Sequence, residues 1–316
     1  MRRVIVFVPD RVELFDLAGP VQVFHEAIAA GADYRLEYVS TQDTIATEQS
    51  LAIARLLPLP HDTGPNDTIV IPGSAAMREA ACMHPSKIAD VTAWLRSSFG
   101  NGARIASVCV GAFVLGASGL LDDRHATTHW KFTDALREAF PRARVAGNRL
   151  YVFDGLIATS AGIASGVDLA LAIVERDAGA RVAAIVAREM VVGIRRCGAQ
   201  DQLNAYFERR DHVYPEVHAA QDWLVEHPGE SFTIESLAHV AGVSSRTLTR
   251  RFRLATGATV KAYVTSLRLE QARALLRDKA LTIDAVAERC GFADGRQLRR
   301  LWRTAYGVAP SDARGG

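Results

Sequence analysis

The sequence lacks several features that would assign it to a specialised class of protein. None of its four cysteines forms a CxxC pair or has the spacing of a zinc site, so we expect reduced thiols, no metal and no cofactor. No apolar run reaches the length of about 18 residues that a membrane span needs. The first residues, MRRVIVFVPD, reach an acid too early for a signal peptide and contain no small-residue cleavage site. These absences favour a cytoplasmic protein with an ordinary hydrophobic core.

Charge is nearly balanced overall but is unevenly divided along the chain. The 316 residues carry a formal net charge of +2. From Glu216 to the end, 15 Lys and Arg residues stand against 11 Asp and Glu residues, a net of +4 that leaves −2 for residues 1–215. A basic C-terminal part on a near-neutral body fits DNA binding, although the positions of the arginines matter more than their sum.

One short pattern occurs twice in the C-terminal third of the chain. The first copy, TIESLAHVAGVSSRTLTRRFRLATG, begins at Thr233, and the second, TIDAVAERCGFADGRQLRRLWRTAYG, begins at Thr282. Each predicts a capped helix, a turn at Gly242 or Gly291, and a second, arginine-rich helix. This is the helix-turn-helix arrangement, whose second helix can enter the major groove of DNA. Two such units could reach successive grooves of one duplex; a plain helical bundle is the alternative.

The second helix of each copy has an apolar side and a polar side. Leu248 and Phe252 should face the core in the first copy, as should Leu298, Leu301 and Trp302 in the second. Exposed arginine suits guanine and exposed glutamine suits adenine. The predicted DNA-reading residues are Arg246, Thr249, Arg250, Arg296, Gln297 and Arg300. The residues expected to meet phosphates or solvent are Arg251, Arg253, Arg299 and Arg303. A solvated surface charge is the alternative for any one arginine.

Two further expectations concern this helical part. Residues 261–277 predict a long helix that fixes the spacing of the two units, with Tyr263, Leu267, Ala274 and Leu275 on one face. Gly295 stands where the second reading helix would begin, and we expect it to fray that helix by about 1 kcal/mol relative to Ala.

The first two hundred residues alternate between strand and helix patterns. Short apolar runs predict buried strands at 4–8, 36–39, 68–71 and 105–108. Helical patterns lie at 18–30, 86–99, 111–119, 164–177 and 180–192. Strands that are apolar on both sides and are separated by helices predict an α/β domain with a parallel sheet. Residues 144–158 predict a hairpin or an edge ribbon around Gly147-Asn148 and Asp154-Gly155.

The segment at 106–130 suggests chemistry. A strand ends at Cys109 and a helix begins at once, which is the layout of a nucleophile elbow. A thiol above a helix N-terminus should have a lowered pKa. His129 is a possible partner, and Asp16 and Gly73 could reach the same carboxyl edge of the sheet, where α/β domains bind ligands. Structural roles stay open: Cys109 as a buried hydrophobe, His129 as a cap and Asp16 as a helix start.

These residues resemble two known families. The C-terminal hundred residues resemble the AraC/XylS family of transcription regulators through LAHVAGVSSRTLTRRFRLATG, YVTSLRLEQARALLRD, AVAERCGF and YGVAPSDAR. The N-terminal part is similar to the PfpI-like branch of the class I glutamine amidotransferase-like fold. That similarity runs through the Cys109 elbow, Asp168 and residues 16–20, 70–73, 126–130, 159–162 and 195–200. Together the two halves resemble GlxA-type regulators.

The resemblance implies a domain organisation and partners. It implies a flavodoxin-like α/β sandwich domain at 1–193 that senses a small metabolite and dimerises, a linker at 194–214, and an all-α double helix-turn-helix domain at 215–314. It places base contacts at the six reading positions named above. The implied partners of the homodimer are promoter DNA, RNA polymerase and an amino-acid or quaternary-amine effector. We expect a transcriptional activator.

The sequence departs from the enzymes of the similar fold. Proteolytic relatives carry His after the elbow cysteine, where this chain has Val110. Amidotransferases place an acid two residues after their His, whereas Lys131 and Phe132 follow Trp130 here. Because both triads are incomplete, we expect no catalysis. The residues Asp16, Gly73, Cys109 and His129 are then vestigial or line the effector pocket. The alternative is a cysteine-dependent enzyme acting on a small amide, isocyanide or aldehyde.

Overall fold

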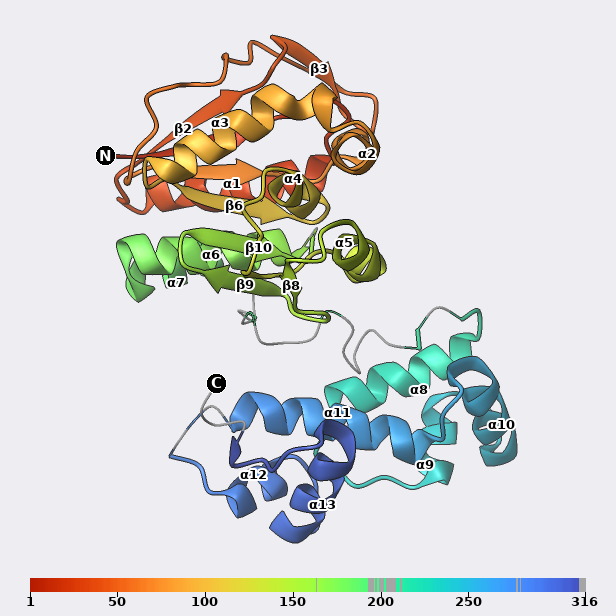
Figure 1. Ribbon diagram of the computed structural model, residues 1–316. Coiled ribbons are helices and arrows are strands. Elements are labelled where there is room, and N and C mark those ends of the chain that lie inside the picture. The colour runs from red at the N-terminus through yellow and green to blue at the C-terminus, as the bar shows by residue number, and fades with distance from the viewer. Residues whose placement is uncertain are drawn as a thin grey trace. The chain divides into compact units, whose positions relative to one another are not determined.

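The computed structural model divides the chain into two compact units, Met1–Gln202 and Leu203–Gly316 (Figure 1). The structure describes residues 1–162, 164–192, 196, 198, 202, 209–210, 212–276, 278 and 280–312. Most of the predicted linker, 194–214, lies outside the described residues, as does the 195–200 segment apart from Arg196 and Gly198. No helix in the described part of the chain is long and apolar enough to cross a membrane.

A six-stranded sheet forms the middle layer of the N-terminal unit, in the order β2-β1-β5-β6-β10-β9. Its strands are β1 (Arg2–Phe7), β2 (Tyr34–Val39), β5 (Thr68–Ile71), β6 (Arg104–Val108), β9 (Tyr151–Asp154) and β10 (Ile157–Ser160). Neighbouring strands are parallel except for the antiparallel pair β10–β9. The predicted α/β fold with a parallel sheet is therefore confirmed.

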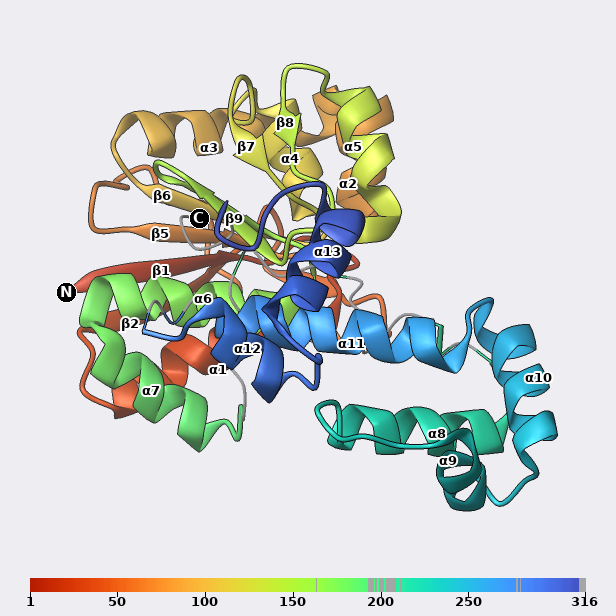
Figure 2. The ribbon, with the colours of Figure 1, turned by 90° about the horizontal axis from the view of Figure 1, so that it is seen from below.

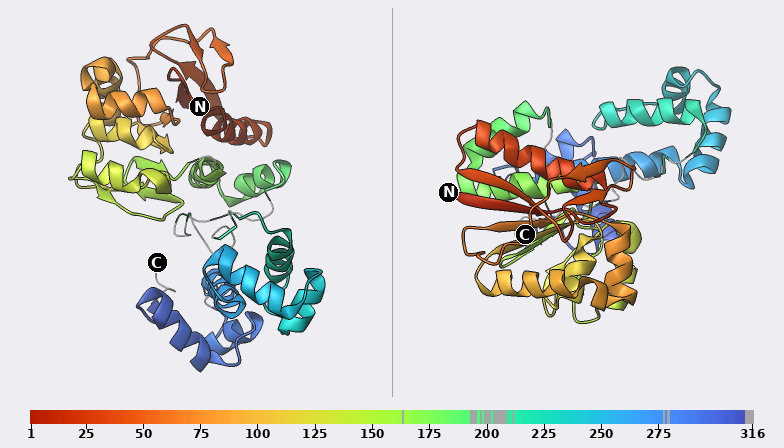
Figure 3. Two further views of the ribbon diagram at one scale, coloured as in Figure 1. Left: turned by 90° about the vertical axis from the view of Figure 1, so that its right-hand side faces the viewer. Right: turned by 90° about the horizontal axis from the view of Figure 1, so that it is seen from above.

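Helices cover both faces of this sheet (Figure 2 and Figure 3). One face carries α1 (Leu14–Ala29), α6 (Ala164–Ala178) and α7 (Ala180–Glu189). The other carries α2 (Ala75–Met83), α3 (Ala89–Gly100), α4 (Gly111–Ala117) and α5 (Thr133–Ala139). The side chains of β1 alternate between the two layers, since Val4 and Val6 pack with α1 whereas Ile5 and Phe7 pack with α3 and α4. A sheet buried on both faces explains why its strands are apolar throughout.

Smaller elements complete this unit. Two short ribbons pair β3 (Thr44–Ala46) with β4 (Ala52–Ala54) and β7 (His125–Ala126) with β8 (Arg144–Val145). The 3-10 turns are η1 (Pro85–Ile88) and η2 (Trp130–Phe132). The hairpin predicted around Asp154-Gly155 is present as β9 and β10, with Gly155 at φ +61°. Residues 144–145 do not join it, because β8 pairs with β7 instead.

The first helix begins earlier than predicted. It starts at Leu14 rather than Ala18, because Leu17, Val23 and Phe24 pack on the sheet as one face. Asp16 therefore lies inside the first turn of the helix and does not precede it.

The C-terminal unit is helical in its described part. Its helices are α8 (Pro215–Glu226), α9 (Ile234–Val240), α10 (Ser245–Thr256), α11 (Val260–Leu275), α12 (Ile283–Arg289) and α13 (Gly295–Tyr306). The pairs α9–α10 and α12–α13 are two helix-turn-helix units, with Gly242 and Gly291 at φ +66° and +75° in their turns. Thr233 and Thr282 cap the first helix of each pair, as predicted.

Two hydrophobic cores lie along α11. The first half of α11 contributes Tyr263 and Leu267 to the core of α8, α9 and α10. The second half contributes Leu269 and Ala272 to the core of α12 and α13. The prediction that Ala274 shares the buried face is wrong: Ala274 is exposed, because the helix turns Ala272 toward the second core.

Gly295 does not fray the second reading helix. The Asp294 side chain caps α13 by accepting the N–H of Gln297 at 2.7 Å. The Gly295 N–H donates to Asp284 Oδ1 at 3.1 Å, and a Cβ on Gly295 would lie 2.2 Å from that oxygen. Glycine therefore permits a contact between α12 and α13 that offsets its low helix propensity.

Gly116→Ala should destabilise the N-terminal unit, although alanine is the better helix former. An added Cβ would lie 2.4 Å from the Phe140 ring, so α4 and α5 must separate, at a cost of about 1–3 kcal/mol. Gly100→Ala in α3 is the matched control, because nothing lies within 4 Å of its added Cβ. The control should be neutral or stabilising by up to about 1 kcal/mol. Urea unfolding measures both, and an unchanged midpoint for Gly116→Ala would contradict the α4–α5 packing.

Candidate functional site

The predicted elbow is a sharp turn between β6 and α4. Cys109 has φ +56°, in the left-handed region that non-glycine residues seldom adopt. Hydrogen bonds hold this conformation on two sides. The Cys109 N–H donates to the Ser160 carbonyl at 3.1 Å, and the Thr128 hydroxyl donates to the Cys109 carbonyl at 2.8 Å. Neighbouring segments thus fix the position of the thiol.

Three of the four predicted pocket residues come together here. A Cβ on Gly73 would lie 2.3 Å from Asp16 Oδ2 and 3.2 Å from the Cys109 Cβ. A Cβ on Gly162 would lie 2.8 Å from the Cys109 Cβ and 2.9 Å from its Sγ, and Gly162 has φ +135°. We call Asp16, Gly73, Cys109 and Gly162 the elbow cluster. Glycine at 73 and at 162 permits this approach.

The predictions did not assign a role to Gly162 or to Thr128. Gly162 follows β10, which is the neighbour of β6, so the ends of these two parallel strands lie side by side. A turn glycine directly after a buried strand was the signal for Gly162. Thr128 is fully buried and bonds a main-chain carbonyl, for which the sequence carries no comparable signal.

The predicted lowering of the Cys109 pKa is wrong. Burial raises the pKa of the thiol well above its usual range, and the negative charge of Asp16 raises it further. Cys109 is 8% exposed and Asp16 is fully buried. The bond with the Val110 backbone at the start of α4 acts in the opposite direction but is outweighed. The thiol is therefore protonated at neutral pH, which disfavours its use as a nucleophile.

His129 acts as a cap. Its Nδ1 accepts the backbone N–H of Lys131 at 3.3 Å at the start of η2, and burial lowers the pKa of the imidazole. Its ring packs beside Trp130 and Phe132, with centroids 5.6 and 6.0 Å away. In the described residues the hydrogen bonds and ring contacts of His129 go to this turn rather than to Cys109. The same residues contain no group of three His, Cys, Asp or Glu side chains placed to hold a metal ion.

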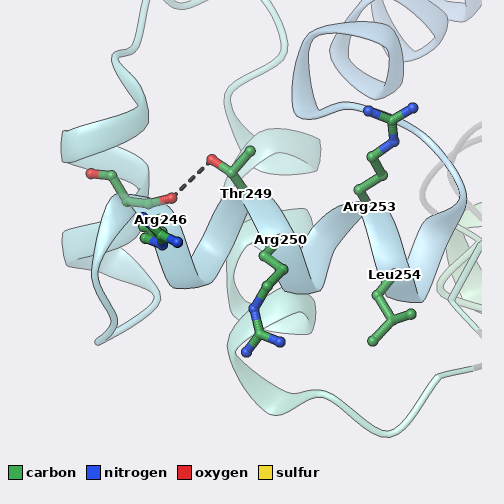
Figure 4. Close-up of a pocket in the computed structure, with 6 residues that line it drawn as sticks. Arg246, Thr249, Arg250, Arg253 and Leu254 are labelled. Atoms are coloured by element: carbon green, nitrogen blue, oxygen red, sulfur yellow. Dashed lines mark hydrogen bonds between the residues drawn. The ribbon is translucent and has the colours of Figure 1, made fainter.

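The first reading helix, α10, presents a basic surface. Ser244 caps it, Leu248 and Phe252 are fully buried, and Arg246, Thr249 and Arg250 are exposed. The exposed side chains line a depression together with Arg253 and Leu254. Figure 4 shows Arg250 and Leu254 projecting to the same side of α10, with Arg253 on the other side. The dashed line in that figure is the bond that the Thr249 hydroxyl donates to the Ser245 carbonyl at 2.8 Å.

The second reading helix, α13, repeats this arrangement. Leu298 and Trp302 are buried, whereas Arg296 and Arg300 are exposed. The expected exposure of Gln297 is not found, because its Oε1 accepts the N–H of Ala293 at 2.7 Å and the side chain is half-buried.

Two arginines that were expected to meet phosphate or solvent have a carboxylate partner within the protein. Arg251 forms an ion pair with Glu216 of α8, which ties α10 to α8. Arg299 lies 4.0 Å from the carboxylate of Asp284 in α12. By contrast, in the described part of the chain Arg246, Arg250, Arg296 and Arg300 form no ion pair with a carboxylate. The charge of these four exposed arginines is free for an external partner.

Family models match both parts of the chain. The DJ-1/PfpI family model matches residues 2–176, and a helix-turn-helix domain model matches residues 237–316. The chain therefore belongs to the DJ-1/PfpI family and carries a helix-turn-helix region in its C-terminal part.

Among curated proteins, the chain is similar to transcriptional regulators. It is 31% identical over 214 residues to the HTH-type transcriptional regulator ArgR of Pseudomonas aeruginosa, covering 68% of this chain and 65% of that protein. It is 31% identical over 213 residues to the HTH-type transcriptional regulator GlxA of Rhizobium meliloti, covering 67% of this chain and 65% of that protein. The matches thus span just under two thirds of the length of these relatives.

Solved structures share the fold. An AraC family transcriptional regulator from Pseudomonas putida matches 60% of this chain and 100% of its own, with a TM-score of 0.52 at 20% identity. A ThiJ/PfpI family protein from Pseudomonas syringae matches 76% of this chain and 90% of its own, with a TM-score of 0.54 at 22% identity. At these identities the likeness shows the fold alone.

Asp16→Asn should make Cys109 more reactive. The substitution removes the carboxylate charge that raises the thiol pKa, so the pKa falls and more thiolate is present at a given pH. Each unit by which the pKa falls gives about tenfold more thiolate, since both proteins are below the thiol pKa. Mass spectrometry of iodoacetamide alkylation measures the rate, with the exposed Cys82 as internal reference. An unchanged rate at Cys109 would refute the electrostatic role of Asp16.

Proposed function

We propose that this protein is a sequence-specific DNA-binding transcriptional regulator controlled by a small molecule. The observation that carries the proposal is the pair of capped reading helices, α10 and α13, within one helical unit. Each buries two apolar anchors on one side and exposes arginines on the other. The names of the curated relatives support the same activity.

We assign the base contacts to both reading helices. Arg246 and Arg250 of α10, with Arg296 and Arg300 of α13, offer guanidinium groups that pair with guanine O6 and N7. Thr249 keeps acceptor capacity on its hydroxyl oxygen. Gln297 keeps its amide N–H donors, although its oxygen also serves the start of α13. Arg253, Arg299 and Arg303 are exposed and suit phosphate contacts.

We place the effector at the elbow cluster, which lies at the carboxyl edge of a parallel sheet, where α/β domains bind ligands. A buried carboxylate, Asp16, next to an apolar thiol suits a cationic amine, in keeping with an amino-acid or quaternary-amine metabolite. Asp16 and Cys109 are nearly closed off from solvent, so the cluster must open for a ligand to enter. The ligand must also bind the open and closed states with unequal affinity if it is to shift the protein between them. A homodimer acting as an activator with RNA polymerase in the cytoplasm stays a prediction.

The second candidate function is a cysteine-dependent enzyme. The strained backbone at Cys109 favours it, since such strain clusters at active sites. The raised thiol pKa, the capping role of His129 and the presence of Val110 weigh against it. Consumption of an amide, isocyanide or aldehyde by the wild type but not by Cys109→Ser would establish turnover. An intact inducer response in a Cys109→Ser reporter strain would exclude covalent chemistry from regulation.

Arg250→Ala and Arg296→Ala should each weaken specific DNA binding by about 1–3 kcal/mol, because each removes a bidentate base contact. Fluorescence anisotropy with promoter DNA, against a scrambled duplex of the same length, gives the specific part. Arg188→Ala in α7 is the control for loss of one exposed positive charge and should bind as the wild type does. Wild-type affinity in both reading-helix variants would refute the assignment.

A further inference from the structure

Arg268 lies in the middle of α11 and holds three main-chain carbonyls. Its Nε donates to the Pro228 carbonyl at 2.8 Å, its Nη2 to the Glu230 carbonyl at 2.9 Å, and its Nη1 to the Gly291 carbonyl at 2.5 Å. Pro228 and Glu230 belong to the loop between α8 and α9, whereas Gly291 is the turn residue of the second helix-turn-helix unit. One guanidinium thus bonds the loop before the first helix-turn-helix unit to the turn of the second.

The same spot brings the two backbones into close approach. A Cβ on Gly291 would lie 2.5 Å from the Gly229 carbonyl oxygen and 2.9 Å from the Arg268 Cζ. A Cβ on Gly229 would lie 3.0 Å from the Arg289 carbonyl oxygen. Burial lowers the pKa of Arg268, as expected for a cation partly withdrawn from water and satisfied by carbonyl dipoles. Lysine could not match this geometry, since its ammonium lacks the planar fork of donors.

We propose that Arg268 is the positioning residue that sets the separation and orientation of the two reading helices, and hence the spacing of the two DNA boxes that the protein accepts. The inference rests on the proposed DNA-binding function. The two hydrophobic cores are distinct and share α11, so the helix alone leaves them free to bend or twist against each other. The Arg268 bonds add a second connection, off the axis of α11, between α8–α9 and α12–α13.

The test measures how affinity depends on box spacing. Duplexes selected from a random pool by the wild-type protein supply the two boxes, and one base pair is then inserted or deleted between them. This shifts the second box by about a tenth of a helical turn, so wild-type affinity should fall about tenfold or more. In Arg268→Met the penalty should shrink to about threefold or less. Arg273→Met is the matched control, because Arg273 contacts Glu270 and Tyr306 within the second unit.

Each outcome decides one question. A spacing penalty in Arg268→Met equal to that of the wild type overturns the positioning role, even if overall affinity falls. If Arg268→Met fails to fold by circular dichroism, Arg268→Lys decides, since it keeps the charge and one donor group and should show an intermediate penalty. A wild-type protein that selects no DNA sequence would instead refute the proposed function.

A separate observation concerns Gln202, which ends the N-terminal unit. Its Nε2 donates to the carbonyls of Thr128 at 2.9 Å and Arg149 at 3.0 Å, and its Oε1 accepts the Trp130 N–H at 2.7 Å. Thr128 in turn bonds the Cys109 carbonyl. Nearby, Arg196 pairs with the buried Asp168 at 2.7 Å. Two successive hydrogen bonds, from Gln202 to Thr128 and from Thr128 to Cys109, therefore connect the end of the N-terminal unit to the elbow.

We infer that Gln202 couples the elbow cluster to the segment that leads to the DNA-binding unit. A ligand that moves Cys109 moves Thr128, and with it the amide contacts that fix Gln202. Coupling is reciprocal in binding free energy, so DNA must also alter the elbow. This inference too rests on the proposed function.

The alkylation rate of Cys109 by iodoacetamide, with and without saturating selected DNA, tests the coupling. DNA should change the wild-type rate about fivefold or more, and Gln202→Ala should lose this response while still binding DNA. Gln22→Ala, which removes an exposed amide from α1, should keep it. A wild-type rate that ignores DNA, or a response retained in Gln202→Ala, overturns the coupling. If Gln202→Ala unfolds, Gln202→Glu decides, since it loses the amide donors but keeps an acceptor for Trp130.

Discussion

Backbone crowding at the carboxyl edge of the sheet is the constraint on which the N-terminal unit depends. The ends of β5, β6 and β10 meet there, and the α1 segment that carries Asp16 fills the remaining space. A Cβ on Gly111 would lie 2.3 Å from the Ile71 carbonyl oxygen, so α4 can start beside β5 only with glycine at that position. Gly73 and Gly162 serve the thiol in the same way. The elbow geometry thus depends on glycine at positions 73, 111 and 162.

Backbone segments also lie close together in the C-terminal unit, where glycine residues and the charge of an arginine accommodate them. Gly229 and Gly291 let two turns touch, and the Arg268 guanidinium fills the carbonyl-rich space beside them. The half-buried guanidinium and the three carbonyls satisfy one another's hydrogen bonds, which offsets their partial removal from water. These bonds add a second connection between two small cores that α11 also joins, which is the basis of the proposed positioning role of Arg268.

The sequence predicted those parts of the structure that local patterns specify. Apolar runs gave the parallel sheet, and the caps at Thr233 and Thr282 with the glycine turns gave both helix-turn-helix units. The wrong predictions concern residues whose environment is set by a partner distant in sequence or by main-chain groups. The Cys109 pKa depends on burial and on Asp16, which precedes Cys109 by 93 positions in the sequence. The role of Arg268 could not be predicted, because its partners are main-chain carbonyls, which every residue type has.

The elbow thiol combines the backbone geometry of a nucleophile elbow with a raised pKa that disfavours the thiolate. The bond with the Val110 backbone at the start of α4 lowers the thiol pKa, whereas burial raises it by more. Here Asp16 acts in the same direction as burial, so the two larger effects oppose the smaller one. The left-handed conformation at Cys109 costs about 1–3 kcal/mol, and the hydrogen bonds to Ser160 and Thr128 help to offset this cost.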